Sequence, residues 1–506
     1  MLARVYSCAL TGLSGTIIEV EVDLSSLEEP KTIVVGLPDT AVQESKERVR
    51  GAIKNSGLRS MRNRITVNLA PADLRKEGPC FDLPIAIGEL ACRDETWIPE
   101  LDDVLIVGEL SLDGSVRHVR GILLIAAKAK EMGFKSVCVP ACDAPEAALI
   151  PGIEVLPVHS LLELYYHFIG EQRIEPQQPC ELTETTVTVR TDFSEIKGQE
   201  HVKRALEIAA AGSHNVLMTG SPGTGKTLLS RALPSILPRM TLEESLDVSR
   251  IYSIEDMLPP DIPLIRTRPF RAPHHTVSYA GLVGGGNIPR PGEISLAHRG
   301  VLFLDEFPEF SKALLEVLRQ PLEDHIVTIN RVHGSYIFPA SFLLCCAQNP
   351  CYCGFAGDPV HECICRPADI ERYQRKISGP ISDRIDLQVY VPRVKYEDLH
   401  ATEAEETSAQ IRERVCAARN IQLKRLKRYG VYCNAGMNHR QVERFCKLDA
   451  ACNTLMENAF CKLGLSARSY DRILKVARTI ADLETSDIIF PSHIAEAIQL
   501  RTQVNQ

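Results

Sequence analysis

The chain has 506 residues and a formal net charge of −8. This length is too great for one hydrophobic core, so we expect two or three domains. Hydrophobic residues make up 44% of the chain and charged residues 24%, which is ordinary for a soluble globular protein. The negative charge argues against a protein that coats nucleic acid with its whole surface, but it allows a local basic strip along a pore or groove.

The cysteine content and the hydropathy pattern indicate the compartment. The seventeen cysteines are odd in number, and most stand singly in apolar segments, as reduced, buried thiols do. The N-terminal residues lack the basic region and long apolar core of a signal peptide. No stretch approaches the ~20 apolar residues that a membrane span needs. We therefore expect a soluble cytoplasmic protein that has no membrane partner.

The distribution of elements predicts an α/β fold with three domains. Residues 1–170 alternate strand-like and helix-like segments, which is typical of an α/β domain. Residues 171–191 are polar and contain proline, as expected of a linker. Residues 192–395 alternate strands and helices again, now with glycine-rich turns. Residues 396–506 form a run of amphipathic helices, which predicts a helical C-terminal domain.

A strand, a glycine-rich loop and a helix follow one another near residue 220. Residues 215–220 are predicted to form a buried strand, and a helix is predicted after residue 226. The loop between them matches the phosphate-binding pattern GxxxxGK[ST], in which backbone N–H groups surround phosphates at a helix N-terminus. We expect Lys226 to reach the β- and γ-phosphates of ATP and Thr227 to bind Mg²⁺. The candidate nucleotide-binding residues are Gly220, Ser221, Pro222, Gly223, Thr224, Gly225, Lys226 and Thr227.

Two further apolar strands end in polar residues that suit the same site. The segment 300–306 (GVLFLDE) places Asp305 and Glu306 at a strand end. Asp305 is expected to hold Mg²⁺ through water, and Glu306 to act as the general base that polarises the attacking water. A strand at 341–350 ends in Asn349, whose side chain can contact the γ-phosphate or orient the water. Asn349 can also be a turn residue before Pro350.

Two arginines follow these motifs in the chain. Arg384 precedes a predicted strand, and Arg468 opens a predicted helix of the C-terminal domain. A single arginine is most often a surface ion-pair partner. Both arginines follow the phosphate-binding loop and the acidic pair in the chain. This order favours a catalytic function for them, which is to stabilise the charge that develops on the γ-phosphoryl group.

Three segments resemble the ComM/YifB family of magnesium-chelatase-like AAA+ proteins, which are related more distantly to the MCM helicases. They are residues 192–227 (DFSEIKGQEHVK…GSPGTGKT), 268–307 (RPFRAPHHTVSYAGLVGGGNIPRPGE…FLDEF) and 465–483 (LSARSYDRILKVARTIADL). The resemblance runs along essentially the whole chain.

The resemblance implies a homo-hexameric, ATP-dependent DNA helicase with branch-migration activity, used in bacterial natural transformation. It implies single-stranded or branched DNA and recombination proteins as partners. In the terms of this superfamily, Asn349 matches sensor 1 and Arg468 matches sensor 2. Arg384 matches the arginine finger that reaches the ATP of a neighbouring subunit.

The N-terminal domain resembles the Lon proteolytic domain, particularly over residues 108–140 (GELSLDGSVRHVRG…SVCVP). This raises peptidase activity as a rival function. Cys80 stands where Lon-type peptidases carry the serine nucleophile, and a cysteine can in principle attack a peptide bond. Leu123, however, stands where these peptidases carry the lysine base. The catalytic dyad is therefore incomplete, and we expect a domain that stabilises the ring or handles DNA.

Four cysteines lie on one short loop directly after Asn349. They are Cys351, Cys353, Cys363 and Cys365, in a CxC–x9–CxC pattern. Four thiolates on a loop with glycine and proline can enclose one tetrahedral Zn²⁺, and His361 is a substitute ligand nearby. CxC is less common than CxxC at zinc sites, and the alternatives are four ordinary reduced thiols or two disulfides formed in a damaged preparation. We expect a structural Zn²⁺ with no catalytic role.

Two glycine-containing segments are candidates for loops that grip a polymer in a ring pore. Residues 281–293 (GLVGGGNIPRPGE) carry Arg290, and residues 325–339 (HIVTINRVHGSYIFP) are predicted to form a hairpin with Arg331 and His333 near its turn. Basic hairpin tips let an acidic protein hold phosphates. The alternative is that these segments are solvated turns.

Two other functions use the same motor. One is a protein-remodelling ATPase, which passes a polypeptide through the pore. The pore segments carry arginine and histidine where unfoldases carry aromatic and hydrophobic tips, and this disfavours it. The other is a chelatase-type ATPase that drives a metal-inserting partner. Stimulation of ATP hydrolysis by DNA, by unfolded protein or by neither distinguishes the three.

Overall fold

The computed structural model describes residues 2–25, 31–58, 64–92, 101–178, 191–259, 264–286, 289–331, 334–394, 405–463 and 465–502. The chain forms two compact units. Unit 1 comprises Met1–Thr185 and Ser245–Ile265, and unit 2 comprises Thr186–Glu244 and Arg266–Gln506. The predicted linker at 171–191 lies largely outside the described residues, as does His333. None of the helices in the described ranges has both the length and the apolar character that a membrane span requires.

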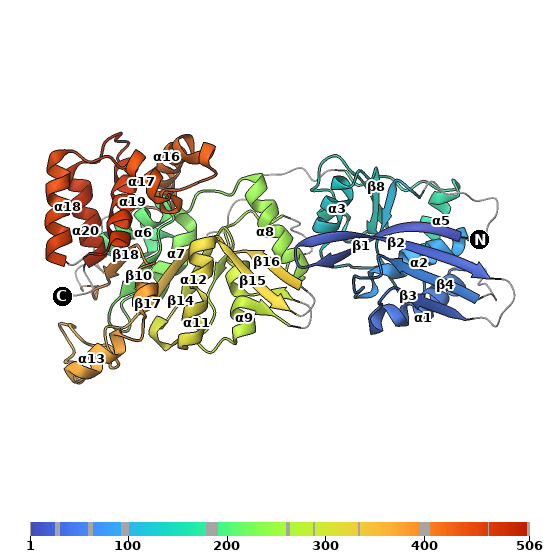
Figure 1. Ribbon diagram of the computed structural model, residues 1–506, viewed down its shortest axis with the longest axis horizontal. Helices are drawn as coiled ribbons and strands as arrows, with labels where there is room; N and C mark the ends of the chain where they lie inside the picture. The colour runs from blue at the N-terminus through green and yellow to red at the C-terminus, as the bar shows by residue number, and fades with distance from the viewer. Residues whose placement is uncertain are drawn as a thin grey trace. The chain divides into compact units, whose positions relative to one another are not determined.

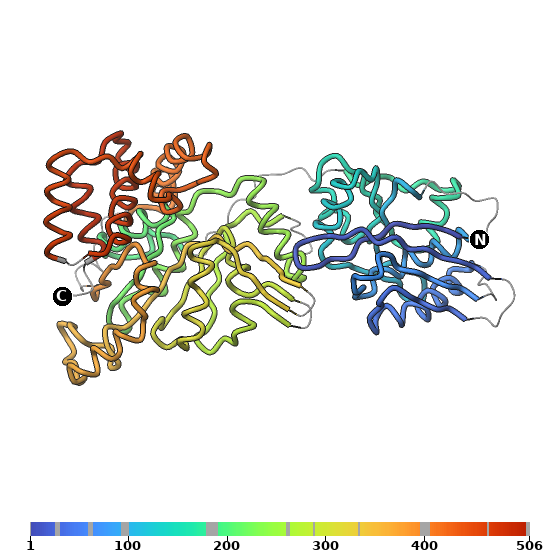
Figure 2. Tube along the Cα trace, viewed as in Figure 1, coloured from blue at the N-terminus to red at the C-terminus, as the bar shows by residue number. Residues whose placement is uncertain are grey.

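Unit 1 is built on a seven-stranded mixed sheet with the strand order β3-β4-β2-β1-β5-β8-β9. β1 and β2 form a long antiparallel hairpin (Figure 2). β4 runs antiparallel to β2, and the other neighbouring strands are parallel. Along β4, Ile65, Val67 and Leu69 are buried and alternate with partly exposed residues, because successive strand side chains point to opposite faces. The strands are β1 (Leu2–Thr11), β2 (Ser14–Ser25), β3 (Thr32–Val35), β4 (Arg64–Ala70), β5 (Val104–Ile106), β8 (Ser136–Pro140) and β9 (Glu154–Val158), with β6 (Glu109–Leu110) and β7 (Val116–Arg117) as a separate pair.

The helices of unit 1 pack on this sheet and include a segment from the middle of the chain. They are α1 (Thr40–Asn55), η1 (Pro79–Phe81), α2 (Asp82–Ala91), α3 (Ile122–Glu131), α4 (Ala144–Ala147) and α5 (Leu161–Phe168). α8 (Leu242–Ile254) begins in unit 2, and its residues from Ser245 onward belong to unit 1. There Ser253 Oγ lies 2.5 Å from Oε1 of Glu146, and the Ser253 carbonyl accepts from Gly121 N at 3.2 Å. The segment 245–265, which the sequence places in the 192–395 domain, therefore packs with the N-terminal residues.

Unit 2 contains a five-stranded parallel sheet with the order β11-β14-β17-β10-β18. β10, β14 and β17 are buried along their whole length, as expected for central strands covered on both faces. They confirm the three apolar strands predicted around the phosphate-binding loop. The strands are β10 (Val216–Thr219), β11 (Phe270–Arg271), β14 (Val301–Leu304), β17 (Leu343–Gln348) and β18 (Leu387–Tyr390).

The remaining elements of this part of unit 2 surround the sheet. The helices are η2 (Phe193–Glu195), α6 (Glu200–Gly212), α7 (Lys226–Ile236), α9 (Tyr279–Val283), α10 (Glu293–Leu296), η3 (Phe307–Glu309), α11 (Lys312–Val317), α12 (Arg319–Asp324), α13 (Pro367–Gln374) and α14 (Gly379–Ser382). Two hairpins stand apart from the sheet. They pair β12 (Gly284–Gly285) with β13 (Arg290–Pro291), and β15 (Ile326–Arg331) with β16 (Gly334–Pro339).

The C-terminal residues form the predicted helical bundle, which is continuous with the core of the parallel sheet. Figure 1 shows α16–α20 gathered beside α6. One hydrophobic cluster runs from Val216 and Leu229 to Ile411 and Ile480. α16 begins with a capping box of Thr407 and Gln410, which satisfies two backbone donors at the helix start. The helices are α16 (Ser408–Leu426), η4 (Lys427–Tyr429), η5 (Asn434–Gly436), α17 (His439–Phe445), α18 (Ala450–Leu463), α19 (Ala467–Leu483) and α20 (Pro491–Thr502).

Candidate functional site

The glycine-rich loop joins the carboxyl end of β10 to the first turn of α7. Gly223 and Gly225 have φ values of 78° and 88°, a left-handed conformation that glycine adopts without strain. Gly220 lies against the chain after β18, so that a Cβ there would be 2.3 Å from the Val391 carbonyl oxygen. The loop therefore needs glycine at these positions to present its backbone N–H groups at the helix N-terminus.

Lys226 lies folded back within this loop. Its ammonium nitrogen lies 2.6 Å from the Gly220 carbonyl oxygen, 2.9 Å from that of Ser221 and 3.2 Å from Oδ1 of Asn349. Burial lowers the pKa of Lys226 to about 8, although the Asp305 carboxylate acts in the opposite direction. A cation held only by neutral oxygens is well placed to exchange these contacts for phosphate oxygens.

The predicted acidic pair lies at the end of β14, next to the loop. Thr227 Oγ1 donates a hydrogen bond to Oδ2 of Asp305 at 3.0 Å. A hydroxyl and a carboxylate this close match the oxygen ligands that Mg²⁺ prefers. Glu306 follows with a φ of 51°. Residues other than glycine rarely adopt a positive φ, and those that do are often found at functional sites. The backbone N–H of Glu306 donates to Oδ1 of Asp305 at 2.9 Å.

The structure therefore brings together Lys226, Thr227, Asp305, Glu306 and Asn349. The strands that carry them are neighbours in the parallel sheet, in the order β14-β17-β10. Their carboxyl ends meet at one edge, which is where α/β sheets bind ligands.

Two residues at this edge were not singled out from the sequence. Nδ1 of His275 lies 3.2 Å from Oε2 of Glu306. Gln199 donates from Nε2 to the carbonyl oxygen of Thr224 at 2.8 Å and to that of Pro392 at 3.2 Å. His275 belongs to the motif APHHT and Gln199 precedes α6. Neither position has a spacing signal that reveals its partner, because both contacts depend on tertiary packing.

The two predicted arginines lie in different surroundings. Arg384 is 7% exposed, donates from Nη1 to the Pro380 carbonyl oxygen at 2.5 Å and forms an ion pair with Glu323. In this chain it is therefore held within its own unit. Arg468 lies exposed in the first turn of α19. The nearby Arg472 forms an ion pair with Asp386, two residues after Arg384.

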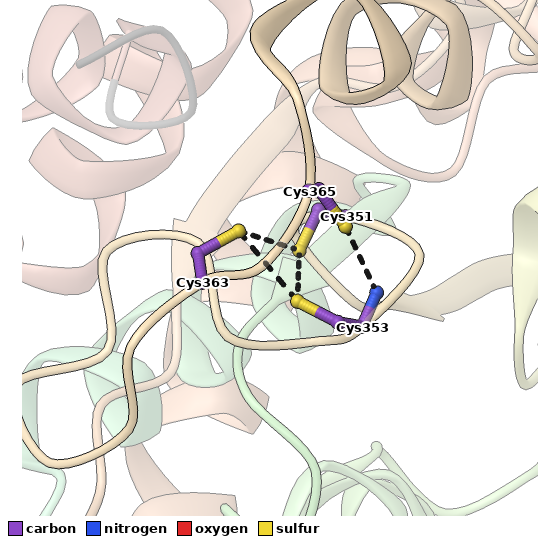
Figure 3. A group of neighbouring side chains, drawn as sticks. All are labelled: Cys351, Cys353, Cys363 and Cys365. Atoms are coloured by element: carbon purple, nitrogen blue, oxygen red, sulfur yellow. Dashed lines mark hydrogen bonds between the residues drawn. The ribbon is translucent and has the colours of Figure 1, made fainter.

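The four cysteines of the loop after Asn349 converge (Figure 3). The Sγ–Sγ distances are 3.3 Å for Cys351–Cys353, 3.7 Å for Cys351–Cys363 and 3.6 Å for Cys353–Cys363. Four sulfurs at ~2.3 Å from a tetrahedral Zn²⁺ lie about 3.8 Å apart. The Cys353 backbone N–H donates to Sγ of Cys365 at 3.4 Å. The geometry therefore fits a tetrahedral metal site.

The cysteine loop is anchored beside the phosphate-binding loop. A Cβ placed on Gly354 would lie 2.7 Å from the ring of Pro222, so the two loops are in direct contact. The buried carboxylate of Asp358 accepts hydrogen bonds from Nε of Arg393 at 2.7 Å and from His361 N at 2.9 Å. The His361 ring packs on Phe355 with a centroid distance of 4.9 Å, and His361 is outside the group of converging ligand atoms.

A second group of neighbouring ligand types lies in unit 1. It consists of His118, Cys142 and Asp143. Nδ1 of His118 lies 2.6 Å from Asp143, and Nε2 lies 3.1 Å from Asp256. The hydrogen bond to Asp143 raises the pKa of His118. Because both ring nitrogens face carboxylates, this group forms an ion-pair network with no nitrogen left for a metal.

The two candidate substrate hairpins lie against each other. A Cβ on Gly284 would lie 2.9 Å from Cδ1 of Ile329, and one on Gly285 would lie 3.1 Å from Nη2 of Arg331. Arg290 and Arg331 are both exposed. The hairpin predicted at 325–339 is confirmed by the β15–β16 pairing. Residues 287–288 and 332–333 lie outside the described residues.

Family models and relatives cover nearly the whole chain. Residues 192–399 match the model "Magnesium chelatase, subunit ChlI", residues 20–143 match "Subunit ChlI of Mg-chelatase", and residues 405–501 match "Magnesium chelatase, subunit ChlI C-terminal". The competence protein ComM of Haemophilus influenzae is 42% identical over 99% of this chain and 98% of its own length. The uncharacterized protein YifB of Escherichia coli is 41% identical over 99% of this chain and 97% of its own length.

The chain belongs to the ComM/YifB family. It is a magnesium-chelatase-like AAA+ protein with an N-terminal ChlI domain, a central ATPase domain and a helical C-terminal domain. The magnesium-chelatase 38 kDa subunit of Rhodobacter capsulatus is more distant, with 31% identity over 31% of this chain and 50% of its own length.

In this ComM/YifB-family chain the N-terminal domain carries Cys80 and Leu123. Leu123 is fully buried, and Cys80 packs against the same apolar cluster. Burial raises the pKa of the Cys80 thiol well above its usual range, so the sulfur is held as the poorly nucleophilic thiol. The Leu123 backbone N–H donates to Oε1 of Glu146 at 3.0 Å. These surroundings fit a structural domain better than a peptidase site.

Proposed function

We propose that this chain is an ATP-driven DNA motor of the helicase and branch-migration type, which works as a homo-hexamer in DNA uptake or recombination. The proposal joins two features of unit 2. One is the ATPase edge around Lys226, Asp305 and Glu306, and the other is the pair of adjacent hairpins that carry Arg290 and Arg331. The name of the Haemophilus relative, a competence protein, supports a function connected with DNA.

The proposed ATP site uses the contacts described above. The loop from Gly220 to Thr227 surrounds the phosphates, and Lys226 exchanges its carbonyl contacts for β- and γ-phosphate oxygens. Thr227 and Asp305 would hold Mg²⁺, which would supply positive charge beside the phosphates. Glu306 removes the proton of the attacking water, and Asn349 orients that water or contacts the γ-phosphate.

The two arginines are proposed to stabilise the developing charge on the γ-phosphoryl group. Arg384 acts on the ATP of a neighbouring subunit in the ring, and Arg468 acts from the C-terminal domain. Because Arg384 is paired with Glu323 in the single chain, its proposed action requires it to exchange this carboxylate for phosphate when the ring assembles.

The observation that carries the DNA-motor proposal is the contact between the two hairpins. Arg290 and Arg331 are far apart in sequence, yet the glycines of β12 leave room for the side chain of Arg331. Two exposed guanidinium groups on adjacent hairpins can hold successive phosphates of one strand. His333, which the sequence alone places near the turn of this segment and which lies outside the described residues, is a third candidate contact.

Two parts of the chain are proposed to have structural functions. The four cysteines hold a Zn²⁺ that fixes the loop after Asn349, with all four positions filled by protein so that no catalysis takes place there. The N-terminal domain has the Lon-like fold with an incomplete dyad, and it serves to stabilise the ring or to handle DNA.

The test is the rate of ATP hydrolysis with single-stranded DNA, with unfolded protein and with neither. A DNA motor is stimulated by DNA alone. Stimulation by unfolded protein alone supports a protein-remodelling ATPase. Hydrolysis that responds to neither polymer favours the chelatase type, and both outcomes contradict the proposal.

A further inference from the structure

The helical C-terminal domain carries a basic segment in an acidic chain. The net charge of the chain is −8, yet residues 424–447 contain seven arginines and lysines and a single carboxylate, that of Glu443. Glu443 lies 3.4 Å from Nε2 of His439, and Arg425 is paired with Asp482. The other six basic residues are exposed and form no ion pair with a carboxylate in the described ranges: Lys424, Lys427, Arg428, Arg440, Arg444 and Lys447. Such a local excess of positive charge is typical of a surface that binds a polyanion.

Two of these arginines lie on one aromatic ring. The guanidinium carbon of Arg428 lies 4.9 Å from the ring centroid of Tyr429, and that of Arg444 lies 5.9 Å from it. Arg444 also lies 5.5 Å from the ring centroid of Phe445, and this ring meets Tyr429 edge-on at 6.0 Å. Because the face of an aromatic ring attracts a cation, Tyr429 brings together two guanidinium groups from η4 and α17.

The elements that carry the two arginines are fixed by packing. Leu426, just before η4, and Val442 of α17 are buried in the hydrophobic cluster of unit 2, and Phe445 packs against that cluster. α17 begins with a capping box of Asn438 and Gln441, which satisfies two backbone donors at the helix start. Since the arginines already rest on a fixed surface, they lose less side-chain entropy when they bind a ligand.

The arrangement suits phosphate groups. An arginine that lies on a ring keeps the N–H donors at its edge, whereas an arginine paired with a carboxylate uses them. These donors form a fork that matches two oxygens of a phosphate. Unpaired bases can stack on an exposed ring, but Tyr429 is already in contact with two guanidinium groups and with Phe445. The cluster therefore favours a phosphate backbone, whose charge is densest on duplex DNA, at one phosphate per ~1.7 Å of helix axis.

The cluster is separate from the residues that are proposed to grip a single strand. Figure 1 shows α17 among the C-terminal helices, away from β15 and β16. Arg290 and Arg331 belong to the two hairpins, so they do not form part of the cluster around Tyr429. A motor that moves a branched DNA meets duplex arms as well as the strand on which it pulls. The C-terminal helices can therefore contact a part of the substrate that the hairpins do not hold.

We propose that Arg428 and Arg444, held on Tyr429, form a second nucleic-acid site, which binds the phosphate backbone of duplex DNA without reading its sequence. The hairpins of Arg290 and Arg331 engage one strand, and the site on the C-terminal helices holds a duplex arm of the same substrate. This inference rests on the proposed DNA-motor function, which supplies the identity of the polyanion.

The test measures binding of the full-length protein to a labelled DNA duplex over a range of salt concentrations. R428A/R444A should bind at least about tenfold more weakly at physiological salt, and the slope of log affinity against log salt should fall by about two. Its ATP hydrolysis without DNA should equal that of the wild type. R444E and K462E change the charge equally, and Lys462 lies exposed in the last turn of α18. K462E should therefore bind like the wild type, and R444E should not.

Two variants of Tyr429 test the ring itself. Y429F keeps the aromatic face and should keep the affinity for the duplex. Y429L keeps both arginines but not the face that holds them, and should bind about threefold more weakly.

Three results separate the outcomes. Wild-type affinity and salt slope in R428A/R444A, or equal weakening by R444E and K462E, overturns the site. Binding of the wild type to vesicles that contain phosphatidylserine, without binding to the duplex, also overturns it and assigns the cluster to a lipid surface. Duplex binding that depends on the two arginines, in a protein whose ATP hydrolysis ignores DNA, supports the site and contradicts the DNA-motor function alone.

Discussion

The ammonium nitrogen of Lys226 lies 3.2 Å from Oδ1 of Asn349, which joins the phosphate-binding loop to the end of β17. Asn349 is followed at once by the cysteine loop, and Gly354 of that loop touches Pro222. The nucleotide loop, the third strand end and the candidate zinc loop thus form one contiguous set of contacts. A change in any of them is expected to alter the position of the groups that bind the ATP phosphates.

The first prediction separates binding from hydrolysis. K226A removes the cation that meets the phosphates, so ATP binding should be lost. E306Q keeps that cation and removes the base, so it should bind ATP, hydrolyse it at least about 100-fold more slowly and favour a stable ring. Binding of a fluorescent ATP analogue and phosphate release measure the two steps. Wild-type turnover in E306Q contradicts the assignment of the general base.

The second prediction concerns Arg384. If it acts on the neighbouring subunit, R384A and K226A are each inactive alone. A mixture should then recover part of the ATPase activity, because some interfaces pair an intact loop with an intact arginine. E323Q, which removes the resting partner of Arg384, should not lower activity. Absence of recovery at every mixing ratio, in rings shown to contain both variants, counts against action between subunits.

The third prediction concerns the cysteine loop. Protein purified without chelators should carry about one zinc per chain. C363S should lose this zinc and also lower ATPase activity, since metal binding orders the loop that packs on Pro222. C461S is the matched control, because Cys461 is exposed and lies outside the cluster. Protein without zinc, with all four thiols freely titratable in the native state, identifies them as ordinary reduced cysteines.

The fourth prediction concerns pH and the buried His298, between α10 and β14. Burial, with help from Arg299, lowers the pKa of His298 to about 3, and Nδ1 accepts from Ser341 N at 3.0 Å. The unfolded chain therefore binds this proton at higher pH than the folded chain. The stability that His298 contributes is complete above pH ~6.5 and is lost as the pH falls toward about 3.

Between these limits, each unit by which the pH falls lowers the free energy of unfolding by at most about 1.4 kcal/mol, because His298 is protonated in the unfolded chain only. Denaturant midpoints of the wild type and H298N at neutral and mildly acidic pH measure this contribution. Asparagine can accept the same hydrogen bond without titrating. The midpoint of H298N should thus fall less on acidification, and equal falls in both proteins contradict the assignment.

The parts of the site that the sequence predicts are those fixed by local pattern. The phosphate-binding loop Gly220–Thr227 is contained in one short segment, and so is the strand that ends at Asp305. Both could therefore be predicted directly from the sequence. The pairing of His275 with Glu306 could not, because it depends on β11 lying beside β14. The ion pair of Arg384 with Glu323 could not be predicted either, nor could the membership of residues 245–265 in unit 1. Both follow from tertiary packing.

The most direct test of the DNA-motor proposal is ATP-driven branch migration of a synthetic DNA junction, with strand release followed on a gel. The wild type should release the strand only when ATP can be hydrolysed. E306Q should bind the junction and release no strand. The double variant R290A/R331A should lose release and most DNA binding, while its DNA-free ATPase activity persists. No release by an active wild-type ATPase, or full release by R290A/R331A, contradicts the account.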